Sequence, residues 1–399
     1  MKAAHVVASI FAFTLFILLP LECLLRFLPP PRYNINWIYD PVIGHRGPRN
    51  QLVRLPINVT TQYNSYGYRG DDPTPRETRR DHFSVFVLGD SITEAVQVPW
   101  RRSFTKRLEY LLTEKLGRDA EVTAFAVSDY GTTNELLVYA KEAKAQKPDV
   151  VVLQFLGLND FVNNGIGFAD KNKAMSDFAR PYLIPKRLEG KLKAYPLLGE
   201  ENPFTYLNPT WKSWRESIRL LSYFDFFKTT IAWKKKREIL LDEPSSDFCA
   251  TEVEVFLDQP DERWQDSFEV TGRMAELLQT QVDLSESSQK GVPPRLIAVY
   301  APSYFEVYDP AWEKGVELSL MRCFQKSYHR ENPEKRFLEL FRKAGVETYS
   351  LKEDFKRSPL PIQKLYLPDG HFSSEGHALA AQSLFRLIAQ KPPASARQR

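Results

Sequence analysis

The sequence is poor in the residue types that most often build metal sites. Its 399 residues include only three cysteines, Cys23, Cys249 and Cys323, and only six histidines. No Cys/His spacing resembles a zinc site. If the body of the protein lies outside the cytoplasm, Cys249 and Cys323 can pair as a disulfide; two buried free thiols are an equally open alternative.

A strong excess of one charge is also absent. The chain carries 54 Lys and Arg against 50 Asp and Glu, a net charge of +4. It has no basic tail of the kind that follows nucleic acid, so we expect no nucleic-acid partner. We find no internal repeat, and the 43% hydrophobic and 13% aromatic content is typical of a folded protein.

One long apolar run is present, at the N-terminus. It extends from residue 6 to residue 21 and approaches the roughly 20 residues that cross a bilayer. No small-residue cleavage site follows, and Glu22 precedes Cys23 where a lipoprotein signal needs a small residue. The pattern predicts an uncleaved membrane anchor over residues 1–28, with the body periplasmic or extracellular. A buried N-terminal helix is the alternative, and flanking arginines leave the orientation open.

After a connector at residues 29–81, continuous apolar runs alternate with amphipathic segments. The apolar runs predict strands at residues 83–90, 120–131, 149–160, 295–303 and 346–351. The amphipathic segments predict helices at residues 101–117, 132–149, 261–282, 333–345 and 373–390. This alternation is typical of a parallel sheet covered by helices on both faces, in a domain spanning residues 82–395.

Local signals mark where some of these helices begin and end. Ser103 is a plausible cap and Gly117 ends the same helix, whereas Thr132 and Glu135 form a capping box that opens the next one. The alternation breaks at about residues 161–290, which we interpret as an insertion. Its aromatic and basic stretch suits a substrate lid or a membrane-facing surface, or alternatively packing against the core.

Polar residues follow three of the predicted strands at their carboxyl ends. These ends read Gly-Asp-Ser, Asp-Tyr-Gly and Gly-Leu-Asn-Asp. In parallel sheets such ends meet at one edge, so we expect Ser91, Gly131 and Asn159 in one crevice. A serine nucleophile, the N–H groups of Ser91 and Gly131, and the Asn159 amide are the parts of an acyl-transfer site with an oxyanion hole. A purely structural interpretation stays open for two of these residues: Gly131 as a helix-start glycine and Asn159 as a turn residue.

A serine nucleophile needs a base, and few histidines qualify. Four of the six lie in the anchor, in the connector, at the wrong edge of the sheet or in a charged surface stretch. His377 falls inside the last helix, where packing or capping is the simpler role. His371 precedes that helix at the active edge, and Asp369 lies two residues earlier. We therefore predict His371 as the base, with its ring oriented by Asp369.

These segments resemble the SGNH (GDSL) hydrolases in four blocks. The blocks are GDSIT with Ser91, DYGTT with Gly131, GLND with Asn159, and DGHFSSEGH with His371. The resemblance covers roughly residues 82–160 and 291–390. It implies a flavodoxin-like three-layer α/β/α fold with a five-stranded parallel sheet, and ester hydrolysis without metal or cofactor. It also implies structural roles beside the site for Asp90, Gly157 and Asp160.

The chain departs from the family pattern in two respects. The family places an Asp three residues before the His, where this chain has Pro368, so Asp369 is one residue closer. A main-chain carbonyl is the alternative partner for His371. The insertion is longer than compact members carry, and together with the anchor it resembles membrane-anchored bacterial members.

The predicted function is a serine esterase acting on acyl esters, in particular acetyl esters, of envelope carbohydrate or lipid. The alternative is an O-acetyltransferase that acts on an envelope polysaccharide through the same Ser-His site. A scaffold that retains the motif without turnover is a third hypothesis. The expected partners are the acylated substrate and, through the anchor, the membrane.

Overall fold

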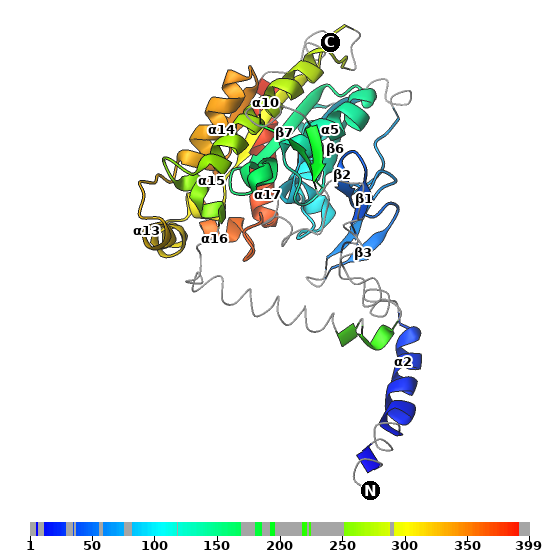
Figure 1. Cartoon of the computed structure of the whole chain (residues 1–399). Coiled ribbons are helices and arrows are strands. Elements are labelled where there is room, and N and C mark those ends of the chain that lie inside the picture. Colours follow the sequence, from blue (N-terminus) through cyan, green and yellow to red (C-terminus); the bar gives the residue numbers. More distant parts are fainter. Residues whose placement is uncertain are drawn as a thin grey trace.

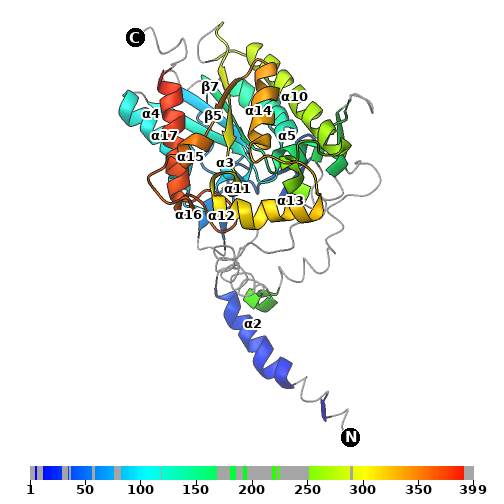
Figure 2. The ribbon, with the colours of Figure 1, turned by 90° about the vertical axis from the view of Figure 1, so that its left-hand side faces the viewer.

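The computed structural model contains a five-stranded parallel sheet between two layers of helices (Figures 1 and 2). Its strands are β5 (Phe83–Gly89), β6 (Ala120–Ala126), β7 (Val150–Leu156), β10 (Arg295–Ala301) and β11 (Glu347–Ser350). The structure describes residues 5–6, 12–28, 35, 37–55, 59–75, 82–117, 119–168, 180–185, 192–195, 218–221, 223–224, 251–287 and 291–390.

The strand order places two predicted site segments next to each other. The order is β11-β10-β7-β5-β6, and every neighbouring pair is parallel. From β5 the chain passes first to β6 on one side and then to β7 on the other, so the order reverses at β5 and β7. Ligands in such sheets bind outside the carboxyl ends of the strands at this reversal. The predicted flavodoxin-like fold class is confirmed.

Helices cover both faces of the sheet, as the continuous apolar strands require. One face carries α4 (Phe104–Leu116) and α17 (Ser374–Gln390), which pack on each other. The other carries α5 (Thr132–Val138), α10 (Glu262–Asp283) and α14 (Asn332–Lys343), and Figure 2 shows the two layers on either side of β5 and β7. All seven residues of β5 are buried.

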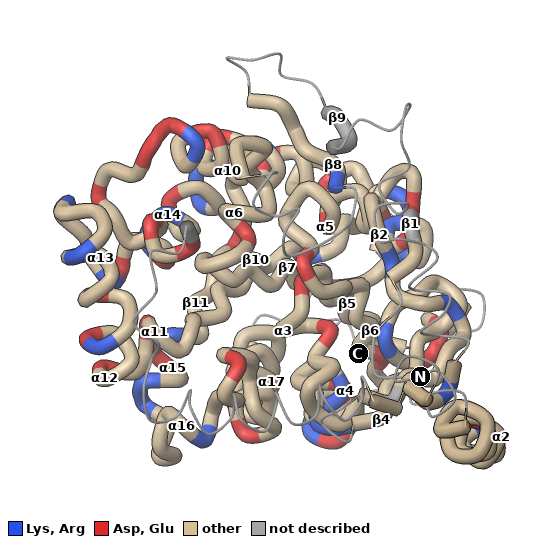
Figure 3. The backbone as a smooth tube through the Cα atoms, turned by 60° about the horizontal axis from the view of Figure 1, so that its bottom comes forward, with Lys and Arg blue, Asp and Glu red and all other residues tan. Residues whose placement is uncertain are grey.

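Short helices complete the body, several of them directly after a strand. They are α3 (Ser91–Glu94), α6 (Asp160–Asn164), α11 (Tyr304–Val307), α12 (Asp309–Ala311), α13 (Leu318–Cys323), α15 (Lys352–Lys356) and α16 (Ile362–Leu365). Figure 3 shows the five strands side by side, with α3 next to β5. In that view Lys and Arg positions are interspersed with Asp and Glu positions over the body, in keeping with the small net charge.

Phe155 on β7 lies at the centre of the core beneath α14. It is fully buried, and the rings of Phe161, Phe337 and Phe341 lie 4.9, 5.2 and 5.5 Å from it. We expect Phe155→Ala to lower the free energy of unfolding by about 3–5 kcal/mol, because it removes buried apolar area and leaves a cavity. Urea denaturation measures this change. Tyr110→Ala, at a 65% exposed position on α4, is the control that should leave stability nearly unchanged.

The helix-boundary signals are confirmed in one helix and wrong in the next. Ser103 caps α4 through its side chain, and Gly117 ends it at φ 61°. The predicted capping box of Thr132 and Glu135 is not formed. The N-cap of α5 is instead Gly131, whose N–H donates to the Asn134 side chain. Glu135 is fully buried rather than turned back to the helix start.

The connector is packed onto the body along the β6 edge. It forms two hairpins, β1 (Ile38–Asp40) with β2 (Gly44–Arg46), and β3 (Leu52–Arg54) with β4 (Thr60–Gln62). Asn134 Nδ2 donates to the Ile43 carbonyl at 2.7 Å, and Ile43 is buried in the core cluster on the α5 face. The connector therefore belongs to the same structural unit as the sheet.

The prediction of a membrane anchor is wrong, and so is the localisation that depended on it. In the part of the chain that the structure describes, no helix combines the length and apolar character needed to cross a bilayer. The N-terminal segment contains a π-helical turn, Thr14–Leu18, followed by α2 (Leu19–Arg26). Within α2, Glu22 pairs with Arg26 at 3.0 Å and accepts the backbone N–H of Leu220 at 2.8 Å. A charged pair with a polar tertiary contact thus follows directly after the apolar run of residues 6–21.

Part of the predicted insertion lies outside the described residues. The helix predicted at residues 261–282 is α10, whereas the aromatic and basic stretch at 206–241 is described only at 218–221 and 223–224. A hairpin of β8 (Arg180–Leu183) and β9 (Leu192–Tyr195) also falls in this insertion. Cys323 is disulfide-bonded and Cys23 is free, while Cys249 lies outside the described residues.

Candidate active site

Ser91 is the first residue of α3, directly after β5, and its turn is held from below by Gln154. The Gln154 Oε1 accepts the Asp90 N–H at 3.3 Å and the Thr93 hydroxyl at 2.9 Å. Asp90 is the N-cap of α3, and its side chain accepts the Ile92 N–H at 2.9 Å. A Cβ on Gly89 would lie 2.6 Å from Gln154 Oε1 and would overlap Thr93. The Gly-Asp pair that precedes Ser91 is therefore what this tight turn requires.

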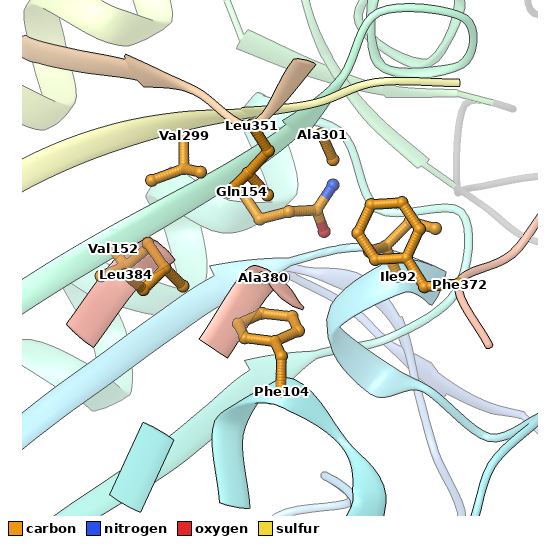
Figure 4. A pocket seen from close by; sticks show the side chains of 10 residues that line it. All are labelled: Ile92, Phe104, Val152, Gln154, Val299, Ala301, Leu351, Phe372, Ala380 and Leu384. Carbon is orange, nitrogen blue, oxygen red and sulfur yellow. The ribbon is translucent and has the colours of Figure 1, made fainter. Parts of the chain in front are cut away.

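The space beneath the turn is apolar and closely filled. Figure 4 shows the Gln154 side chain among apolar side chains that include Ile92 and Phe372, the residues that follow Ser91 and His371 in sequence. The cavity left between them is about 10 Å³, which is roughly the space that one water molecule needs. These closely packed apolar side chains support the Ser91 and His371 segments from the same side.

The structure brings His371 to Ser91 although 280 residues separate them in sequence. The His371 Nε2 lies 2.9 Å from Ser91 Oγ, and both side chains are partly exposed. His371 sits on a tight turn in which the Gly370 N–H donates to the Leu367 carbonyl at 2.9 Å, and Gly370 has φ 87°. Since that backbone conformation favours glycine, the Asp-Gly-His sequence fits the turn.

Asp369 contacts the same histidine twice. Its Oδ1 accepts the His371 backbone N–H at 3.2 Å, and its Oδ2 lies 3.2 Å from His371 Nδ1. The second distance suits an ion pair, but the atoms are not aligned for a hydrogen bond. Burial lowers the pKa of His371, while Asp369, followed by Asp90 and Asp129, raises it by more, so that the net pKa lies above its usual value.

The Asp369 contact gives a testable pH effect. General-base catalysis needs neutral His371, so activity should rise with pH through the raised pKa of this group. Asp369→Asn removes the negative charge that raises this pKa, so the acidic limb of the kcat/KM profile should move to lower pH. We also expect kcat to fall by about tenfold or more, because the ring loses its charged partner. An acidic limb that stays in place would show that another group orients His371.

His377, the second histidine of this segment, has the packing role expected from the sequence. It is buried in α17, and its Nδ1 accepts the Phe104 N–H at 3.3 Å. Burial lowers its pKa to about 3. His377 is therefore neutral at physiological pH, and it joins α17 to α4.

Asn159 lies at the end of β7 with its amide directed at the Ser91 turn. Its Nδ2 donates to Asp90 Oδ2 at 2.9 Å, which fixes the amide and leaves its second N–H free to reach a ligand. Asp160, the next residue, accepts the Leu156 N–H at 2.6 Å and is fully buried. At Gly157 a Cβ would lie 2.5 Å from the Tyr300 hydroxyl oxygen. These contacts hold the β7 end close to Asp90.

Gly131 is not joined to Ser91, His371 or Asn159 by the described contacts. Its N–H donates to Asn134 Oδ1 at 3.2 Å, and the residue is buried. A Cβ there would lie 2.7 Å from Asn164 Oδ1 and 2.9 Å from Asn163 Cβ. The glycine thus allows α5 to begin against α6. Its assignment to the oxyanion hole stays a prediction.

Asp129, two residues earlier, was missed in the sequence. It adopts the left-handed conformation at φ 66°, is partly exposed, and is close enough to His371 to raise that residue's pKa. Within the described residues its N–H has no hydrogen-bond partner. Asp is among the few residues that enter this conformation readily, so an Asp after a strand end was the available signal.

Comparison with known proteins adds the family to this geometry. Residues 87–192 match the GDSL-like Lipase/Acylhydrolase family. The matched segment includes Ser91 and Asn159. It ends before His371, which the fold nevertheless brings to within hydrogen-bond distance of Ser91. The match confirms the predicted GDSL resemblance and the predicted enzyme class, a serine ester hydrolase. The membrane-anchored type is not supported. Among curated proteins, none matches the chain.

Several solved esterase structures resemble this GDSL-like chain at low identity. An acetylxylan esterase from Geobacillus stearothermophilus is 12% identical with a TM-score of 0.38, covering 77% of this chain and 94% of its own. A lipase/acylhydrolase from Enterococcus faecalis is 14% identical with a TM-score of 0.34, covering 78% and 98%. A carbohydrate acetylesterase family member from Sinorhizobium meliloti is 12% identical with a TM-score of 0.36, covering 77% and 98%. Similarity this distant does not identify a substrate.

Proposed function

We propose that Ser91 is the nucleophile of this ester hydrolase and His371 its general base. The observation that carries the proposal is the 2.9 Å contact between Ser91 Oγ and His371 Nε2 at the strand edge. In the first step His371 takes the Ser91 proton while Oγ bonds to the ester carbonyl carbon, and then returns a proton to the leaving alcohol. Water, deprotonated by the same histidine, releases the carboxylic acid and restores Ser91.

The negative oxygen that forms on the carbonyl needs donors on its other side. We assign this role to the Ser91 N–H, at the start of α3, and to the second N–H of the Asn159 amide, whose first N–H donates to Asp90. The third donor is the Asp129 N–H, or the Gly131 N–H if it leaves Asn134. Each such donor is typically worth about 3 kcal/mol of transition-state stabilisation.

The surroundings of Ser91 favour a short acyl group and a hydroxyl-rich alcohol. Beneath Ile92 and Phe372 the core leaves only about 10 Å³ of space, so it offers no channel for a long acyl chain under this turn. The partly exposed Asp129 carboxylate lies near enough to His371 to raise the pKa of that residue, and it suits the hydroxyl groups of a carbohydrate better than a lipid tail. The proposed substrate is therefore an acetyl ester of a carbohydrate.

Hydrolysis of nitrophenyl acetate and nitrophenyl octanoate by the full chain tests this proposal, with acetylated xylo-oligosaccharide in parallel. Acetate release that exceeds octanoate release, together with deacetylation of the sugar, supports it. A preference for octanoate overturns the acetyl assignment. Adding unacetylated sugar distinguishes the O-acetyltransferase alternative, because a transferase diverts acetyl groups to this acceptor and less free acetate appears.

A further inference from the structure

The connector and the helix that carries Ser91 are joined by one buried carboxylate. Glu94 is the last residue of α3 and is 1% exposed. Its Oε1 accepts the Tyr63 hydroxyl at 2.7 Å, and its Oε2 accepts both the N–H and the hydroxyl of Ser128, at 2.8 and 2.6 Å. Ser128 directly precedes Asp129. Glu94 therefore links the Ser91 helix to the turn that presents the free Asp129 N–H.

A buried arginine of the connector fixes the same C-terminal end of α3. Arg69 is 4% exposed, and its guanidinium donates to the carbonyls of Glu94, at 3.0 Å, and of Ala95. A further bond reaches the Val98 carbonyl at 2.6 Å. These are carbonyls at and beyond the C-terminus of α3, which lack helical partners. The short helix is thus held by groups from outside its own strand–helix unit.

The turn at Ser128 is held in a conformation that needs such support. Asp129 has φ 66°, which costs a non-glycine residue energy and persists only where surrounding contacts impose it. The Ser128 carbonyl also lies 3.0 Å from His45 Nε2, so the connector contacts this turn directly. Glu94 supplies two of the bonds that define the turn, and His45 a third.

We propose that Glu94 is a positioning residue of the ester-hydrolysis site, which places the Asp129 N–H opposite Ser91 as an oxyanion donor. This inference rests on the function proposed above. Glu94 does not touch the substrate; it acts through Ser128. The residues Tyr63, Arg69 and His45 make the connector part of the active-site scaffold rather than a tether.

A matched control exists elsewhere in the chain. Glu306 is fully buried and accepts the Tyr300 hydroxyl at 2.7 Å, the Ser303 N–H at 2.9 Å and the Ser303 hydroxyl at 2.8 Å. It repeats the bonding pattern of Glu94 but lies after β10, two strands from β5. Glu306→Ala should therefore lower stability without changing kcat per folded molecule.

The test compares Glu94→Ala, Glu94→Gln and Glu306→Ala in the full chain, with the folded fraction fixed by thermal unfolding. The readouts are kcat and KM for nitrophenyl acetate and the Ki of ethylboronic acid, whose tetrahedral adduct with Ser91 occupies the oxyanion hole. We expect Glu94→Ala to lower kcat and raise Ki by about 10- to 100-fold, with KM nearly unchanged. Glu94→Gln should restore most of both, since its amide oxygen can still accept the two Ser128 bonds.

Some outcomes would overturn the proposal. A folded Glu94→Ala with wild-type kcat and Ki would do so, as would equal losses in Glu94→Ala and Glu306→Ala. If Glu94→Ala does not fold, Ser128→Ala is the substitute, because it removes only the hydroxyl bond to Glu94. It should lower kcat and raise Ki by smaller factors than Glu94→Ala would. Unchanged kcat and Ki in Ser128→Ala would count against the proposal. A wild-type chain without esterase activity would instead reject the proposed function itself.

Discussion

Ser91→Ala should lower kcat for nitrophenyl acetate by about 10⁴-fold or more, while the protein stays folded. In the proposed mechanism the serine supplies the oxygen that bonds to the ester carbonyl, and alanine has no such oxygen. Because Ser91 is partly exposed and begins a turn held by Asp90 and Gln154, alanine should leave thermal stability nearly unchanged.

The same experiment includes His371→Ala and the double variant. Nucleophile and base act as one unit, so the double variant should be about as inactive as either single variant. Losses that multiply would mean that the two residues act independently, contrary to the 2.9 Å contact. Ester hydrolysis by Ser91→Ala at the wild-type rate would place the nucleophile elsewhere.

Asn159→Ala is expected to have the second largest effect. It should lower kcat by about 10²- to 10³-fold, the usual loss when one oxyanion donor is removed. KM should change little, because the donor acts mainly on the charge that develops in the transition state. Stopped-flow and steady-state hydrolysis of nitrophenyl acetate measure both constants.

Asn159 also contacts Asp90, so a control is needed for a purely structural loss. Asn159→Asp keeps the size of the side chain but puts a carboxylate 2.9 Å from Asp90 and at the oxyanion position. It should be at least as inactive as Asn159→Ala. If Asn159→Ala retained wild-type kcat, the oxyanion hole proposed here would be wrong.

Sequence alone predicted the parts of the site that depend on local patterns. Continuous apolar runs located β5 and β7, because strands buried on both faces have no polar alternation. Their carboxyl ends then gave Ser91 and Asn159. His371 followed because its segment leads into the last helix at the same edge, and the structure brings it to Ser91.

The parts that sequence could not predict depend on contacts between distant segments. The choice between the Gly131 and Asp129 N–H groups as oxyanion donors depends on where α5 begins, and the Asn134 side chain, which accepts the Gly131 N–H, favours Asp129. In the sequence, Glu94 is a single acidic residue in the short segment that follows Ser91. Its partner Tyr63 is 31 residues away in the connector, so no local sequence pattern predicts the Tyr63–Glu94 contact.

The N-terminus shows the opposite failure, in which a local pattern misled. The apolar run at residues 6–21 suggested a spanning segment, whereas the described helix α2 (Leu19–Arg26) extends past that run and carries a Glu22–Arg26 pair. Glu22 also accepts backbone N–H groups of Arg219 and Leu220. A hydropathy average does not include the tertiary hydrogen bonds and ion pairs that a single carboxylate such as Glu22 makes.

The most direct test of the central claim is to identify the residue that a fluorophosphonate modifies in the full chain, by mass spectrometry of its peptides. The reagent phosphonylates a serine activated by a neighbouring base. The account predicts one adduct, on Ser91, that is absent in His371→Ala. An adduct on a different serine, or none from a chain that hydrolyses nitrophenyl acetate, would contradict it.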